Sequence, residues 1–274
     1  MTLTNSRVLR NGVVMPVPGL GVAYTSDEDA EKAVLWALEA GCRHVDTAKI
    51  YANEGGVGRA IAASGIPRED IFVTTKLWND DMRNNRQREA FEQSLKDLGL
   101  DYVDLYLIHW PVGNFVESWK IMEDILASKR TRAIGVSNFQ IHHLKELWRA
   151  SGEIPAVNQI ESHPLLTQYP LLEYCAEKDI ACQAWSPLGG EGGAVLKEEA
   201  VVSVAAKHGK SPAQVVLRWD LQRGIVPLPR STRKERIISN LDIFDFELDD
   251  ADMAAIDALD RGHRFGPDPD NFSL

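Results

Sequence analysis

The sequence of 274 residues predicts an α/β fold, a (β/α)8 TIM barrel with an N-terminal β-hairpin and a short irregular C-terminal arm. Short runs rich in β-branched residues alternate with amphipathic helical stretches, a pattern that favours parallel strands joined by helices. The length suits one barrel and no linker interrupts it, so we expect a single domain over residues 1–274. The predicted barrel strands cover residues 17–21, 43–47, 71–76, 103–109, 133–136, 156–159, 181–185 and 225–227.

A hairpin is indicated ahead of the first barrel strand. The pair Asn11-Gly12 lies between two short segments that carry apolar residues. An Asn-Gly pair in this setting is a strong hairpin signal. We expect the hairpin to cover the bottom of the barrel, where the strands begin.

Three of the helical stretches have recognisable ends. Residues 27–40 carry acidic side chains in their first turn and are followed by Gly41, which is the polarity expected of a helix. Residues 86–98 stop at Gly99. The pair Ser211-Pro212 supplies an N-cap and then a proline at the first helical position.

Two segments show no helical or strand pattern. The glycine-rich stretch 189–193 follows the seventh predicted strand, and we interpret it as a loop because strand and helix signals continue beyond it. The tail 262–274 contains Gly266, Pro267 and Pro269 and has little periodicity, so we expect it to form the irregular arm.

The composition excludes several classes of function. The 30 basic and 40 acidic residues give a formal net charge of −10, which offers no hint of nucleic acid binding. Cys42, Cys175 and Cys182 match neither a disulfide framework nor a metal site, so we expect no metal and a reducing cytoplasm. No apolar run approaches a membrane span and no signal peptide is recognisable. We therefore expect a cytoplasmic monomer without a membrane partner.

Four residues with acid–base chemistry gather where predicted strands end. Asp46, Lys76 and His109 each lie at the end of such a strand, and Tyr51 lies in the loop after Asp46. Because the carboxyl ends of parallel strands meet at one edge, these side chains should converge. A cationic Lys76 should lower the pKa of Tyr51, Asp46 should hold Lys76, and His109 could orient a carbonyl group. Such a group can donate a proton to a carbonyl oxygen during reduction.

Other interpretations of these residues remain open. A single Asp or Lys at a strand end is usually a surface residue or a member of an ion pair. A single His usually has a structural role, and a single Tyr usually has a packing role. The spacing also does not exclude a lyase that uses Lys76 to form a Schiff base.

Long segments of the sequence resemble the aldo-keto reductases, in the order found in that family. The resemblance implies a (β/α)8 barrel, an Asp-Tyr-Lys-His tetrad matching Asp46, Tyr51, Lys76 and His109, and an extended NADPH bound without a Rossmann glycine motif, which this chain lacks. The segments are GCRHVDTAKIYANEGGVG (41–58), VTTKLWN (73–79), DYVDLYLIHWP (101–111), IGVSNF (134–139), AVNQIESHP (156–164) and LPRSTRKERIISNLDIFDFEL (228–248).

The resemblance also implies a nicotinamide site. Ser137, Asn138 and Gln159 match residues that hold the carboxamide, for which hydroxyl and amide groups are suited. Trp185 stands where most members have a stacking tyrosine, as in bacterial 2,5-diketo-D-gluconate reductases. Ser186 and Leu188 follow in the loop that contacts the pyrophosphate.

Further positions match the sites for the adenosine 2′-phosphate, the adenine and the substrate. Arg230 replaces the usual lysine and can bind phosphate in a bidentate manner, whereas Ser239 replaces a glutamate common near the adenine. The predicted 2′-phosphate and adenine residues are Arg230, Ser231, Thr232, Arg236 and Asn240. The predicted substrate pocket comprises Tyr24, Ile50, Trp78, His109 and Trp110, although large aromatic residues are also common in cores.

The sequence therefore predicts an NADPH-dependent reductase of a small-molecule aldehyde or ketone, with Tyr51 as general acid. Diketogluconate, small dicarbonyls and aromatic aldehydes all remain open as substrates. The reverse reaction, alcohol oxidation, is a second reading. A nucleotide-sensing or structural barrel without significant turnover is the non-enzymatic alternative.

Overall fold

The computed structural model describes residues 5–190 and 192–272. Its central sheet contains the predicted strands in chain order, and all neighbours run parallel, as the prediction required. The strands are β3 (Leu20–Gly21), β4 (His44–Asp46), β5 (Phe72–Leu77), β6 (Val103–Ile108), β7 (Thr131–Ser137), β8 (Val157–Glu161), β9 (Ala181–Trp185) and β10 (Ile225–Leu228).

Hydrogen bonds between the first and last strands close the sheet into a barrel. The amide of Gly19 donates to Pro227 O at 3.2 Å and that of Gly21 to Pro229 O at 3.1 Å. A side chain would be crowded at both positions, because a Cβ at Gly19 would lie 2.5 Å from Leu228 Cδ2 and 2.9 Å from His44 Nδ1, and one at Gly21 would lie 3.2 Å from Leu228 O. The predicted (β/α)8 barrel is confirmed.

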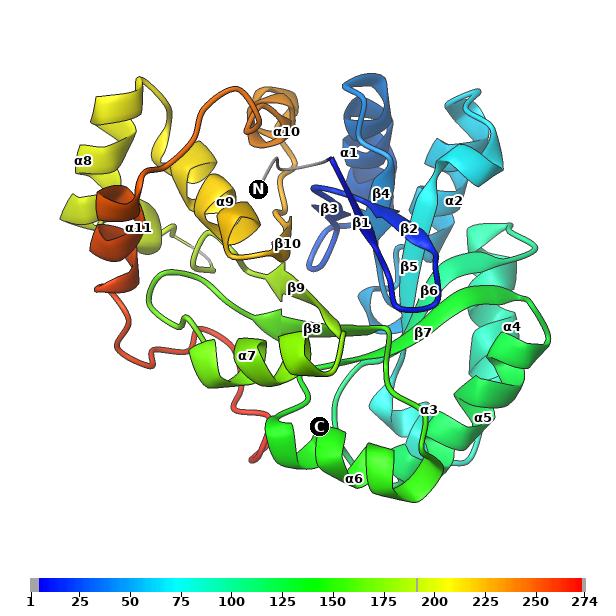
Figure 1. Cartoon of the computed structure of the whole chain (residues 1–274). Helices are drawn as coiled ribbons and strands as arrows, with labels where there is room; N and C mark the ends of the chain where they lie inside the picture. Colours follow the sequence, from blue (N-terminus) through cyan, green and yellow to red (C-terminus); the bar gives the residue numbers. More distant parts are fainter. Residues whose placement is uncertain (1–4, 191, 273–274) are drawn as a thin grey trace.

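Helices surround the strands (Figure 1). They are α1 (Asp27–Glu39), α2 (Glu54–Ala63), α3 (Asn79–Arg83), α4 (Gln87–Leu98), α5 (Phe115–Ala127), α6 (Ile141–Ser151), α7 (Tyr169–Glu177), α8 (Glu199–His208), α9 (Pro212–Gln222), α10 (Lys234–Leu241) and α11 (Asp250–Asp257). Short 3-10 turns are η1 (Lys49–Tyr51), η2 (Arg68–Asp70) and η3 (Val195–Lys197).

The helix ends follow the predicted chemistry. Ser26 caps α1 by accepting from Asp29 N at 3.1 Å, and Ser211 forms a capping box at the start of α9. Helix α4 ends at Gly99, whose φ of +64° lies in the left-handed region. The predicted helix 27–40 ends one residue earlier, with Ala40 as its C-cap.

The predicted hairpin is also present and lies across the barrel in Figure 1. It pairs β1 (Ser6–Val8) with β2 (Val14–Pro16), and Asn11-Gly12 lies within the connecting turn. Met15 is fully buried and packs with residues from the barrel interior such as Leu105 and Val157. The hairpin therefore covers the end of the barrel at which the strands begin.

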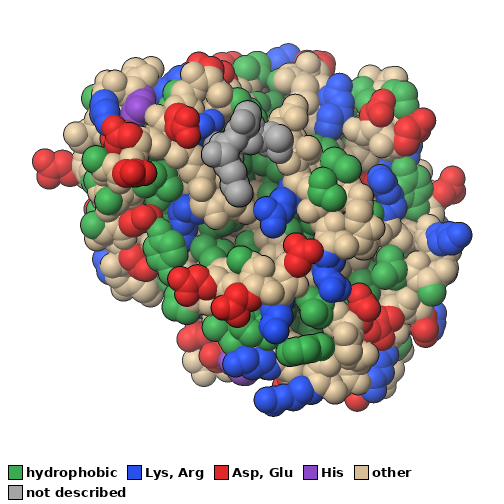
Figure 2. Space-filling view, in the orientation of Figure 1, with side chains coloured by type: hydrophobic (Ala, Val, Ile, Leu, Met, Phe, Trp, Pro, Cys, Tyr) green, Lys and Arg blue, Asp and Glu red, His purple; other side chains and the backbone are tan. Residues whose placement is uncertain are grey.

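The remaining segments are irregular, as expected. The predicted loop 189–193 and the arm from residue 262 contain no helix or strand among the described residues, while Glu191, Ser273 and Leu274 lie outside them. Acidic and basic side chains are interspersed on the face shown in Figure 2. Within the part of the chain that is described, no helix is long and apolar enough to cross a membrane.

Candidate functional site

A buried ion pair lies at the edge of the barrel where the strands end. Asp46 is the last residue of β4, and Lys76 comes from β5. Lys76 Nζ lies 2.6 Å from Asp46 Oδ1 and donates to Thr47 O at 2.8 Å. The same ammonium lies 5.1 Å from the centre of the Tyr51 ring. The structure thus brings Asp46, Lys76 and Tyr51 together.

His109 completes this group from the residue after β6. Its ring centre lies 5.7 Å from that of Tyr51 and 5.1 Å from that of Trp78, with both contacts edge-on. Burial, with a smaller effect from the Lys76 charge, lowers the pKa of His109 well below its ordinary value. A neutral imidazole is therefore the stable form at this position.

The expectation that Lys76 lowers the pKa of Tyr51 is wrong. The pKa of Tyr51 is raised well above its ordinary value, first by burial and then by the negative charge of Asp46. Burial also lowers the pKa of Lys76, although Asp46 opposes that change. Desolvation thus exceeds the attraction between charges here. The result is a phenol that keeps its proton, as a general acid must before it reacts.

The residues predicted to hold the carboxamide form one hydrogen-bonded group. Asn138 Nδ2 donates to His109 O and to Ser137 Oγ, each at 3.0 Å, and Ser137 Oγ donates to Gln159 O at 2.9 Å. Asn138 has a φ of +67°, a conformation that asparagine tolerates better than most residues. Trp185 Nε1 donates to Asn138 Oδ1 at 2.8 Å, so the indole is tied to the same group.

The loop after β9 begins next to this group. Ser186 has a φ of +50°, which turns the chain sharply after Trp185. Leu188 is half-buried and packs against a cluster of buried apolar residues that includes Val195. Leu188 therefore has a packing role in addition to its predicted position near the pyrophosphate.

The residues predicted to bind the 2′-phosphate and adenine lie along α10 and in the preceding loop, with Arg236 in the first turn of the helix and Asn240 near its end. Ser231 Oγ accepts from Arg233 N at 3.1 Å, Asn240 is buried, and Thr232 is exposed. Among the described residues, no carboxylate forms a salt bridge with Arg230 or Arg236. By contrast, Lys234 on the same helix is paired with Glu39 at 2.9 Å.

Two of the predicted substrate residues, Trp78 and Trp110, lie beside His109, whereas Tyr24 and Ile50 are exposed. Trp78 contacts His109, and Trp110 is buried beside it with ring centres 6.5 Å apart. Tyr24 is 90% exposed, and its ring lies 6.0 Å from the Arg230 guanidinium rather than against Trp78. Ile50 is 46% exposed.

The C-terminal arm supplies contacts that individual motifs did not predict. Phe272 stacks on Trp110 with ring centres 4.1 Å apart. A Cβ at Gly266 would lie 2.3 Å from Trp185 Cη2, so the arm lies directly against the indole. Glu161 Oε1 accepts from Phe265 N at 2.6 Å and holds this part of the arm. An irregular, proline-containing tail gives no sequence signal for such contacts.

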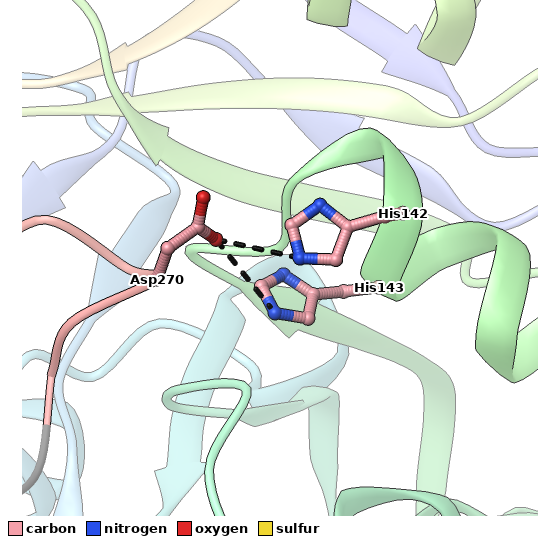
Figure 3. A group of neighbouring side chains, drawn as sticks. All are labelled: His142, His143 and Asp270. Atoms are coloured by element: carbon pink, nitrogen blue, oxygen red, sulfur yellow. Dashed lines mark ion pairs between the residues drawn. The ribbon is translucent and has the colours of Figure 1, made fainter.

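A cluster of His142, His143 and Asp270 fastens the arm to α6 (Figure 3). Asp270 Oδ1 lies 3.4 Å from His142 Nε2 and 3.8 Å from His143 Nε2. His143 Nδ1 accepts the Gln140 amide at 3.1 Å, so the proton of its neutral form lies on Nε2. A metal would have to displace that proton, and the cluster is therefore poorly suited to hold one.

Comparison with known proteins identifies the family. The model of the aldo/keto reductase family matches residues 17–261. The chain is 52% identical to 9,11-endoperoxide prostaglandin H2 reductase of Trypanosoma cruzi, over 98% of this chain and 96% of that protein. It is 49% identical to glyoxal reductase of Bacillus subtilis, over 98% of both chains.

A solved structure agrees with this result. The aldo-keto reductase of Bombyx mori, in complex with NADP, superposes with a TM-score of 0.90 at 39% identity, covering 96% of this chain and 95% of that one. The family match extends over the barrel strands and the site at their ends. This chain belongs to the aldo/keto reductase family.

Proposed function

We propose that this protein reduces small aldehydes and ketones with NADPH, using Tyr51 as the general acid. The observation that carries the proposal is the buried Lys76, which contacts both Asp46 and the Tyr51 ring where the strands end. The family membership and the relatives' printed names support carbonyl reduction. A small dicarbonyl such as glyoxal is the substrate class that we favour, because glyoxal reductase is among the relatives.

Each residue of the site has a distinct role in the proposed reduction. When bound, NADPH supplies the hydride that reaches the carbonyl carbon. Tyr51 donates its proton to the carbonyl oxygen as that oxygen gains charge. The Lys76 ammonium stabilises the phenolate left behind, and Asp46 keeps Lys76 charged. Neutral His109 donates a hydrogen bond that orients the carbonyl group.

The side chains present are compatible with the cofactor. Trp185 offers an aromatic face, and Ser137, Asn138 and Gln159 offer the polar atoms suited to a carboxamide. Arg230 and Arg236 form no salt bridge with a described carboxylate, although the chain carries 40 acidic residues. Two such guanidinium groups favour an anionic ligand, as the 2′-phosphate would be.

We infer that the protein is a single-domain, cytoplasmic monomer. Cys42, Cys175 and Cys182 are free and buried, which suits a reducing compartment.

Substitution of Tyr51 tests the proposed acid. Tyr51→Phe should keep the fold and NADPH binding but lose about 10²- to 10⁴-fold in kcat, the usual contribution of general acid catalysis. Loss of NADPH absorbance with glyoxal and methylglyoxal measures turnover. Tyr106→Phe is a matched control, because Tyr106 is a buried tyrosine outside the site whose hydroxyl has no partner among the described residues.

The absorbance assay, a measurement of NADPH binding and a trapping experiment together separate the alternatives. If Tyr51→Phe turned over like wild type, Tyr51 would not be the proton donor. A wild type that binds NADPH but reduces no carbonyl would favour the nucleotide-sensing barrel. A borohydride-trapped adduct on Lys76, found by mass spectrometry, would favour the lyase.

A further inference from the structure

A row of buried side chains lies inside the barrel below the proposed site. Met15 of the hairpin contacts Gln183 of β9, Gln183 contacts Gln159 of β8, and Gln159 contacts Asp46. Gln183 Nε2 lies 3.1 Å from Met15 Sδ, while Gln159 Nε2 lies 2.9 Å from Gln183 Oε1 and 2.7 Å from Asp46 Oδ2. All four residues are less than 5% exposed. The row thus links the hairpin to the ion pair of Asp46 and Lys76.

The chemistry of the two ends fixes the direction of every hydrogen bond between them. A thioether sulfur and a carboxylate can only accept hydrogen bonds. Gln183 must therefore turn its amino group to Met15 and its carbonyl oxygen to Gln159. Gln159 then faces an acceptor on each side, Gln183 Oε1 and Asp46 Oδ2. Both of its amino protons are used, which leaves its carbonyl oxygen as the one polar atom available to a ligand.

Gln183 contributes the second of the two bonds that hold the Gln159 amide. A single bond to Asp46 would let the amide swing about that contact, whereas two acceptors fix its plane. The strand register supports this geometry, because Gln159 and Gln183 are directly paired residues of β8 and β9. Their side chains consequently lie on the same face of the sheet. Among the described residues, no hydrogen bond reaches Gln159 Oε1.

We propose that Gln183 is a positioning residue: it fixes the Gln159 amide so that its carbonyl oxygen accepts a hydrogen bond from the carboxamide amino group of the nicotinamide. This inference rests on the proposed function. Gln183 acts only through Gln159 and touches neither cofactor nor substrate. We expect Gln183 to affect only the hydrogen bond that the carboxamide amino group donates to Gln159.

A comparison of two nucleotides isolates that contact. In the 3-acetylpyridine analogue of NADP+, a methyl group replaces the carboxamide amino group, so it cannot donate to Gln159. Titration followed by tryptophan fluorescence gives a Kd for each nucleotide without turnover. Wild type should bind NADP+ about 2- to 12-fold more tightly than the analogue, the effect of one neutral hydrogen bond. This ratio is the readout.

Two variants at one position test the role of Gln183. Gln183→Leu removes the acceptor, and the ratio should fall to about 1 as the Gln159 amide loses its second contact. Gln183→Glu keeps an acceptor oxygen toward Gln159, and the ratio should stay close to that of wild type. A general structural defect would weaken both nucleotides together and leave the ratio unchanged. If the leucine variant does not fold, Met15→Leu removes only the sulfur acceptor and should lower the ratio.

The outcomes distinguish this inference from the function on which it rests. A leucine variant that keeps the wild-type ratio overturns the role of Gln183, and so does a wild type with a ratio of 1. In both cases nucleotide binding itself would remain. A wild type that binds neither nucleotide would overturn the proposed function and this inference together.

Discussion

At the scale of single residues, burial has opposite effects on the acids and bases of one site. It raises the pKa of Tyr51 and lowers those of Lys76 and His109, because the charged form of each group is less stable when it is removed from water. Asp46 opposes the change at Lys76 and adds to the change at Tyr51. The site therefore favours an uncharged phenol and an uncharged imidazole beside a lysine held by a carboxylate.

We expect a single side chain, Arg236, to decide the preference for NADPH over NADH. The two cofactors differ only in the 2′-phosphate, and a hydrogen bond to a charged group contributes about 1.5–3 kcal/mol. Arg236→Ala should weaken NADPH binding by roughly 10- to 150-fold and leave NADH within a few-fold. Fluorescence titration measures both, and the NADPH effect should shrink at higher salt.

A neighbouring cation provides the control for this prediction. Lys234 lies on the same helix but is already paired with Glu39, so Lys234→Ala should change neither affinity by much. If Arg236→Ala weakened both cofactors equally, Arg236 would support the loop rather than recognise the phosphate.

The identity of the clustered residues was predictable from the sequence, but the balance of forces on them was not. Asp46, Lys76 and His109 each lie at the end of a strand run, and strand ends meet by topology. The direction of the Tyr51 shift depends on how much water the fold removes, and a sequence does not specify that. Tyr24 illustrates the same limit, because a φ of +55° and the contact with Arg230 direct it away from Trp78.

At the scale of elements, helix α6 depends on a histidine that acts as a cap. His143 Nδ1 accepts from Gln140 N, and burial lowers the pKa of His143 to about 4. Protonation would put an N–H where an acceptor is needed. The helix starts three residues after Asn138, so the cap lies close to the predicted nicotinamide site.

This cap should make stability depend on pH. The folded pKa of about 4 lies below the ordinary 6.5, so the unfolded chain binds the proton more readily between these values. The contribution of neutral His143 is full above pH 6.5 and is lost as pH falls toward 4. His143→Gln keeps a capping acceptor that does not titrate. From pH 7 to 4.5, urea unfolding should show the variant gaining roughly 2–3 kcal/mol relative to wild type. Parallel stability curves would contradict this role.

Elements differ in how well the sequence specifies them. Helix α4 and helix α9 carry their own end signals, in Gly99 and in Ser211-Pro212, and both were predictable. The first barrel strand is reduced from the predicted 17–21 to Leu20–Gly21. Pro18 lacks an amide hydrogen and cannot donate to a neighbouring strand. The His143 cap was not predictable, since glutamate or glutamine is the usual residue at that position.

At the scale of the whole molecule, distant segments complete the site. The N-terminal hairpin reaches Gln183 through Met15, and the C-terminal arm reaches Trp185 through Gly266. Barrel topology was predictable from the alternation of strands and helices. The placement of the arm was not, because its contacts join residues far apart in the sequence, such as Glu161 and Phe265.

Two buried carboxylates show how differently the fold treats the same chemical group. Asp104 is fully buried and accepts from Arg68, Arg132 and the amide of Val73. Asp220 of α9 is equally buried, yet neither of its oxygens has a partner among the described residues. Burial accordingly raises the pKa of Asp220 well above its ordinary value.

The raised pKa of Asp220 should make the stability of the protein depend on pH. Folding favours the protonated form of Asp220. The free-energy cost of burying its ionised carboxylate is therefore absent below about pH 4 and grows as the pH rises toward the folded pKa. Asp220→Asn, which stays neutral, should stabilise the protein by up to about 1.4 kcal/mol for each pH unit in that window. Denaturant unfolding at pH 5, 6.5 and 8 measures the difference. Asp104→Asn is the matched control and should destabilise at each pH, because it removes charge-assisted bonds. An Asp220→Asn variant no more stable at pH 8 than at pH 5, relative to wild type, would mean that the carboxylate is already compensated in the folded state.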